Sequence, residues 1–231
     1  MIILGIETAT ERLSASLLIE NKRNFEHHED SKTSHCELLT KFILDLCEEA
    51  EIGVDDINCI AVSLGPGSFT GLRIGIATAM GLAYGIGVKT CGVNTLMGLS
   101  WEKGSPGSVI CPVIDAKRSE VYTGLYKMNG SGIPEIIHEA CVIPVENFSE
   151  LVSGIHEKIT LTGPDALKFG EILENSHIEN IEIFPSKPSA ESIAEIGLKI
   201  FMETGGVSPI FLEPMYLRRS DAENLRSRGC R

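Results

Sequence analysis

The chain alternates short apolar runs with longer amphipathic stretches. Apolar or alternating runs at 2–7, 13–20, 24–29, 57–64 and 88–93 predict strands. Apolar residues three and four positions apart predict a helix over 34–51, a second from about 70 to 84 and a third over 95–101. Weaker signals predict strands at 159–161 and 181–184 and helices at 164–174 and 190–203. Strands alternating with helices predict an α/β fold with mixed sheets.

The opening pattern recurs in the middle of the chain. Residues 109–127 resemble residues 2–19, since each segment has an apolar strand, one carboxylate, a short turn and a second strand. The carboxylates are Glu7 and Asp115. The repeat predicts two lobes, an N-terminal lobe over 1–105 and a smaller, less regular lobe over 106–231.

Charge and composition exclude several classes of protein. The 231 residues carry a net charge of −12, which disfavours a broadly basic surface for nucleic acid. Residues 57–101 have no acidic side chain, but their uncharged runs are too short to span a membrane. The 7 cysteines form no C-x-x-C pair, and the first residues do not resemble a signal peptide. We therefore expect a cytoplasmic protein with no membrane segment and no disulfide framework.

The glycine-rich segment 65–71 is predicted to be a tight turn that starts a helix. It is not a phosphate-binding P-loop, because Leu72 stands where a lysine is needed. Gly71 and Gly75 then share one helix face, which indicates close approach by another backbone. The approaching element is either part of the same lobe or a second subunit, and the sequence leaves both open.

Two further features each allow two interpretations. Glu7 and Asp115 are either polar ends of strands or carboxylates around a metal-bound nucleotide, with Thr8 and Thr10 near the phosphates. In the second case the protein is an actin-like ATPase or a small-molecule kinase that uses Glu7 and Asp115 around Mg-ATP. The five arginines of the tail 218–231 are either solvated or in contact with phosphate, as in a tRNA-binding protein.

Four segments resemble the bacterial TsaB (YeaZ) family: ILGIETAT (3–10), GPGSFTGLRIG (65–75), DAKRSEVY (115–122) and YLRRSDAE (216–223). The resemblance spans the whole chain in order. It implies a duplicated actin/Hsp70-like (ribonuclease-H-type, ASKHA) two-lobe fold. It also implies a role in making N6-threonylcarbamoyladenosine at position 37 of tRNAs that read codons beginning with A.

The resemblance further implies a non-catalytic subunit. The relative TsaD carries the catalytic metal and is the expected partner, joined by the ATPase TsaE, and tRNA is expected to bind only through this complex. TsaD has two metal-binding histidines after a Gly-Val-Asn segment, and the matching residues here are Thr95 and Leu99. Because neither replaces an imidazole, we expect no metal and no cofactor. Glu7, Thr8, Thr10 and Asp115 then line a vestigial nucleotide cleft.

In this family the contact with TsaD, and with a second copy when TsaD is absent, resembles a bundle of the first two helices of the N-terminal lobe. The expected interface residues here come from 34–49 and 70–82: His35, Leu38, Leu39, Phe42, Ile43, Leu46, Thr70, Gly71, Ile74, Gly75, Thr78, Ala79 and Leu82. The glycines are expected to admit the partner helix, and the larger side chains to supply apolar area.

Overall fold

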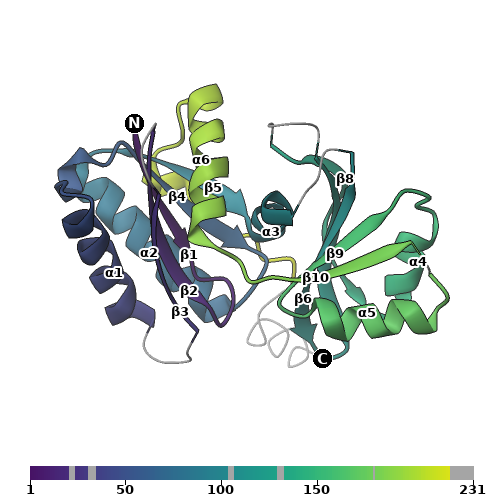
Figure 1. The fold of residues 1–231 in the computed structure, drawn as a ribbon. Coiled ribbons are helices and arrows are strands. Elements are labelled where there is room, and N and C mark those ends of the chain that lie inside the picture. The colour runs from purple at the N-terminus through teal and green to yellow at the C-terminus, as the bar shows by residue number, and fades with distance from the viewer. Residues whose placement is uncertain (21–23, 31–34, 104–106, 129–132, 179, 219–231) are drawn as a thin grey trace.

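The computed structural model has two lobes side by side, each built on a five-stranded mixed sheet (Figure 1). It describes residues 1–20, 24–30, 35–103, 107–128, 133–178 and 180–218. In the first sheet the strand order is β3-β2-β1-β4-β5. Its strands are β1 (Ile2–Glu7), β2 (Leu13–Ile19), β3 (Phe25–Glu29), β4 (Cys59–Gly65) and β5 (Lys89–Asn94).

The second sheet repeats the first, strand for strand. Its order is β10-β9-β6-β7-β8, and its strands are β6 (Val109–Lys117), β7 (Glu120–Lys127), β8 (Glu135–Pro144), β9 (Ile159–Gly163) and β10 (Ile181–Pro185). In each sheet the first three strands are antiparallel neighbours, and the fourth strand pairs parallel with the first and the fifth. The duplication predicted from the repeat is therefore confirmed.

Each sheet has helices on both faces. α1 (His35–Glu49) and α2 (Phe69–Ile86) cover one face of the first sheet through a core that includes Leu39, Leu46 and Leu72. α4 (Phe148–Ser153) and α5 (Ala166–Asn175) cover the corresponding face of the second sheet, where Phe148 and Phe169 meet edge to face.

Each of the remaining two α-helices follows one sheet in the chain and packs on the other (Figure 1). α3 (Thr95–Lys103) follows the last strand of the first sheet, but its Leu96 and Leu99 pack on Ile114 and Tyr126 of the second. α6 (Ala190–Thr204) follows the last strand of the second sheet and packs on the first through a core that includes Ile193. The division expected at 105/106 falls between the two sheets and stays a prediction, although α6, from the second half of the chain, packs on the first sheet.

The other predicted strands and helices are present within a few residues of their expected positions. Among the strands and α-helices of the described residues, the pattern did not predict β8 and the six-residue α4. The first residue of the helix predicted over 34–51, Ser34, lies outside the described residues.

Candidate partner interface and interlobe site

α2 combines well-defined ends with an apolar, partly uncovered surface. The Ser68 hydroxyl accepts a hydrogen bond from the Gly71 amide at 3.2 Å, and Gly87 ends the helix with φ 76°. Within the described residues, α2 alone is long and apolar enough to cross a membrane by length and composition, with only 33% of its length buried. One of its faces closes the core of the first lobe, so its apolar character reflects a packed inner face and an uncovered outer face.

Gly71 and Gly75 lie on the inner face of α2. A Cβ at Gly71 would lie 2.0 Å from the backbone oxygen of Thr8, and a Cβ at Gly75 would lie 2.3 Å from the Thr8 hydroxyl. That hydroxyl donates to the Gly71 carbonyl at 2.8 Å. The close approach is therefore made by the lobe's own β1–β2 turn, and the expectation that these glycines admit a partner helix is corrected.

The structure divides the rest of the expected interface by exposure. Thr70, in the first turn of α2, is exposed. Five more residues of α1 and α2 are half-buried: Leu38, Phe42, Ile74, Thr78 and Leu82. Four others are buried in the first lobe: Leu39, Ile43, Leu46 and Ala79. The side chain of His35 lies outside the described residues. Thr70 and the half-buried residues stay predictions for the interface, whereas the buried residues pack in the core beneath the two helices.

Several exposed apolar residues near this surface were not predicted. Tyr84 on α2 is 78% exposed and Leu44 on α1 is 55% exposed. The small residues Ala77 and Gly81 of α2 are also exposed. Phe69, Ala77 and Tyr84 recur at helical spacing, and this spacing could have predicted an exposed stripe on the outer face of α2. The spacing of Gly71 and Gly75 instead marks the inner face.

The polar residues of the β1–β2 turn hold the turn itself together. Glu7 is fully buried, and its Oε1 accepts from the Ala9 amide at 2.5 Å. The Thr10 hydroxyl accepts from the Arg12 amide at 3.3 Å. With Thr8 bonded to α2, the three residues expected near a nucleotide all have structural roles in this turn.

Asp115 lies near the end of β6, in the corresponding place of the second lobe. Its carboxylate accepts from the Lys117 amide at 2.7 Å and from Lys168 Nζ at 3.0 Å, and Lys117 Nζ lies 3.3 Å away. Partial burial raises the pKa of Asp115, but the bonds from the two lysines and the amide outweigh it and leave the pKa below its ordinary value. The carboxylate is thus ionised and neutralised within its own lobe.

The two positions expected to correspond to the metal ligands of TsaD lie inside the protein. Thr95 and Leu99 are both fully buried at the inner side of α3. Across the described residues, no group of three or more His, Cys, Asp or Glu side chains could hold a metal ion. A threonine hydroxyl and a leucine do not supply the imidazole pair that such a site requires.

A pocket of about 590 Å³ opens between the lobes beside the start of α6. Its walls include Arg12, Glu26, Trp101, Lys187 and Glu195, and the Trp101 indole donates to the Glu195 carboxylate. The pocket is mixed in charge, since Arg12 and Lys187 line it together with Glu26, Glu191 and Glu195.

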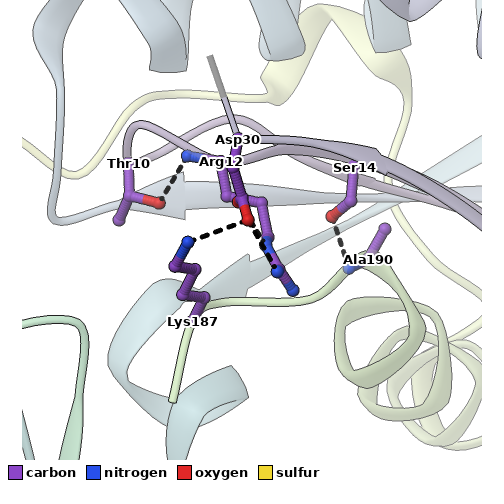
Figure 2. Close-up of polar contacts among 6 residues, drawn as sticks. All are labelled: Thr10, Arg12, Ser14, Asp30, Lys187 and Ala190. Carbon is purple, nitrogen blue, oxygen red and sulfur yellow. Dashed lines mark hydrogen bonds and ion pairs between the residues drawn. The ribbon is translucent and has the colours of Figure 1, made fainter. Parts of the chain in front are cut away.

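An ion-pair cluster holds one edge of this pocket (Figure 2). Asp30, just after β3, accepts from Arg12 at 2.8 Å and from Lys187 at 2.8 Å. Bonds from Arg12 and Lys187 hold the pKa of Asp30 well below its usual range. Nearby, the Ser14 hydroxyl accepts from the Ala190 amide at 2.9 Å. These contacts join the first sheet to the link between β10 and α6, and no motif or periodic pattern predicted them.

Comparison with known proteins places the chain in a family. A family model described as "TsaD: tRNA N6-adenosine threonylcarbamoyltransferase" matches residues 27–170. The tRNA threonylcarbamoyladenosine biosynthesis protein TsaB of Escherichia coli is 34% identical, over 96% of this chain and 96% of its own length. The chain belongs to the TsaB family. The protein of the same name from Bacillus subtilis is 27% identical over 76% of each chain.

Solved structures agree with membership of the TsaB family. YeaZ from Pseudomonas aeruginosa matches with a TM-score of 0.77 and 26% identity, over 94% of this chain and 99% of that chain. An activator of 2-hydroxyisocaproyl-CoA dehydratase from Clostridium difficile matches with a TM-score of 0.52 and 10% identity, over 88% and 95%. The second likeness concerns the fold alone. The duplicated actin/Hsp70-like fold expected for TsaB is confirmed.

Proposed function

We propose that this chain is a non-catalytic subunit in the N6-threonylcarbamoylation of adenosine 37 of tRNA. It binds a TsaD-like catalytic subunit in the cytoplasm, a TsaE-like ATPase joins the pair, and the same surface forms a homodimer when the catalytic subunit is absent. The observation that carries the proposal is the outer face of α2, an apolar helix of which only 33% is buried.

The chemistry of this face suits docking of another helix. Ala77 and Gly81 are exposed, and a Cβ at Gly81 would meet nothing within 4 Å. Small residues let a second helix come close, and the flanking Tyr84 offers a large aromatic surface. Arg73 is the one charged residue in the sequence of α2, so few charges would need to be desolvated.

The geometry around the carboxylates favours a partner role over an ATPase. The Asp115 carboxylate is bonded to Lys117 and Lys168, and Thr8 and Thr10 are bonded within their own turn or to α2. An ATPase would need at least one of these carboxylates to engage a metal-bound nucleotide. These bonds support the interpretation of the cleft as vestigial.

The direct test is the variant Ala77→Arg. It places a long charged side chain on the outer face of α2 without touching the core, so we expect copurification with the TsaD-like subunit to be lost while the melting temperature is kept. Leu167→Arg on α5, at a side chain that is 63% exposed in the second lobe, is the matched control and should leave the complex intact. Survival of the complex in Ala77→Arg would show that the α2 face is not the interface.

A further inference from the structure

The chain that follows α6 passes the edge of the first sheet and reaches α2. At the edge, Val207 and Thr90 of β5 exchange two backbone hydrogen bonds, of 2.8 and 2.9 Å. Pro209–Phe211 then form a short 3-10 helix, η3, which packs against α2. Further along, the Met215 amide donates to the Leu64 carbonyl of β4 at 2.7 Å. Residues 207–216 therefore run from the sheet edge to the strand that leads into α2.

Three elements lie in a row across this face of the first sheet. α1 packs on β2 and β3, and α2 packs mainly on β4. Beyond β4 comes the edge strand β5, and residues 207–211 contact both β5 and α2. α2 is therefore the middle element, with α1 on one side and residues 207–211 on the other. A protein that docks on the outer face of α2 and is broader than one helix must contact one of these neighbours as well.

Buried residues anchor η3, while its two large apolar side chains stay exposed. Pro209 is buried, and Leu212 lies in the core that also holds Leu72 of α2. Between these anchors, Ile210 is 64% exposed and Phe211 is 69% exposed. Single exposed apolar residues are common on protein surfaces, whereas adjacent ones that continue another apolar surface mark binding sites.

The far end of the same segment joins the outer stripe of α2. The rings of Tyr216 and Phe69 have centroids 5.0 Å apart, and the Arg73 Nε donates to the Tyr216 hydroxyl at 3.1 Å. Tyr216 is itself 41% exposed. We call Ile210, Phe211 and Tyr216 the flank of α2. The flank and the outer stripe thus form one continuous surface.

This surface carries little charge in a protein that is strongly acidic. Glu213 is the one charged residue in the sequence from 205 to 216, and Arg73 is the one charged residue in the sequence of α2. Large apolar and aromatic side chains with few charges are typical of the centre of a protein–protein interface. The composition of the flank therefore favours a protein partner over a nucleic acid or another polyanion.

The area of the two helices is too small for a stable complex by itself. α2 has 18 residues and is thus about 27 Å long, so an outer face about 10 Å wide offers about 270 Å². With the 15 residues of α1 the total reaches only about 500 Å². A stable interface buries about 800 Å² on each partner. The flank supplies area of the missing order, because each aromatic side chain can bury up to about 200 Å².

We propose that the flank of α2 is part of the surface that binds the TsaD-like subunit, with Phe211 as its main apolar contact. This inference rests on the proposed function, because that function supplies the partner. It extends the interface from the two helices to residues of the chain after α6. The continuity with the outer stripe, the low charge and the missing area all point to the same occupant.

The first test measures the dissociation constant between this chain and the TsaD-like protein of the same organism by titration calorimetry. Phe211→Ala should weaken binding about 10- to 100-fold, as expected for an aromatic residue at an interface centre. Phe211→Leu, which keeps a large apolar side chain, should lose much less. The melting temperature should stay unchanged, because the side chain is mostly exposed. Leu167→Ala on α5, at a side chain that is 63% exposed, is the matched control and should bind like the wild type.

The second test detects contact directly. A photoreactive benzophenone side chain introduced at position 211 should crosslink to the TsaD-like subunit, and the same group at position 167 should not. A crosslink only to a second copy of this chain would overturn the inference.

The outcomes separate this inference from the proposed function. If Ala77→Arg breaks the complex but Phe211→Ala binds normally and position 211 gives no crosslink, the proposed function stands and the flank is not part of the interface. If the wild-type chain does not bind the TsaD-like subunit, the proposed function is wrong, and the inference falls with it.

Discussion

Individual residues of α2 have opposite roles on its two faces. Gly75 is buried, and a Cβ there would lie 2.3 Å from the Thr8 hydroxyl, whereas Gly81 has open space around it. Both are glycines in the middle of a helix, where glycine costs up to about 1 kcal/mol relative to alanine. Only Gly75 is required by packing within the lobe. Gly81 leaves the outer face of the helix without a side chain at that position.

This difference gives a paired prediction for the two glycines. Gly75→Ala should lower the free energy of unfolding by about 1–3 kcal/mol, because the added methyl group forces Thr8 out of its bond with Gly71. Gly81→Ala should raise the free energy of unfolding by up to about 1 kcal/mol, through helix propensity alone. Chemical denaturation of both variants checks this. Equal shifts of the same sign would contradict the packing of α2 on the β1–β2 turn.

At the scale of elements, the sequence pattern predicted those strands and helices that have one clearly apolar side. β1, β2, β4, α1 and α2 all contribute to the first core, so their apolar positions recur with the right period. β8 was missed because it is an edge strand whose first five residues are all exposed, including Ile136 at 41% and Ile137 at 48%. Its apolar residues therefore do not mark a buried face.

The place of α6 was also beyond the sequence pattern. Its apolar spacing predicted the helix but not the sheet it covers, because that choice depends on how the two lobes meet. Ile193, Ala194 and Ile196 pack on the first sheet, although α6 follows the second sheet in the chain. Local sequence patterns thus predict where a helix or strand lies in the chain, but they do not predict on which of the two sheets a helix packs.

The exchange predicts how fragments of the chain behave. Residues 1–105 alone lack α6 and leave Ile3, Ala61 and Val93 of the first sheet uncovered. We expect this fragment to bind a hydrophobic dye and to unfold without a cooperative transition. A chain that joins residues 1–103 to 187–218 through a flexible linker should restore the transition, as thermal unfolding followed by circular dichroism can show. Cooperative unfolding of the shorter fragment would contradict the assignment of α6 to the first lobe.

At the scale of the whole molecule, the two lobes are tied by contacts between residues far apart in sequence. Asp30 bonds Arg12, 18 positions away, and Lys187, 157 positions away. Of the site, sequence reasoning identified α1, α2 and the two strand-end carboxylates, because motifs and a repeat mark them. It missed the Asp30 cluster, since Arg12, Asp30 and Lys187 are far apart in sequence and become partners only when the fold brings them together.

The Asp30 cluster predicts a pH dependence of stability. Arg12 and Lys187 lower the pKa of Asp30 in the folded state, so the contribution of the cluster is present above the unfolded-state pKa of about 3.9 and is lost as pH falls through the folded-state value. The Asp30 side chain is 40% exposed, so we expect Asp30→Asn to lower the free energy of unfolding by only about 1 kcal/mol or less near neutral pH.

The difference in unfolding free energy between wild type and Asp30→Asn should shrink from about pH 5 downward. Urea denaturation across this range measures it, with Glu171→Gln on α5, which removes an exposed carboxylate elsewhere, as the control. A difference that stays constant with pH would show that the charge of Asp30 does not stabilise the link between the lobes.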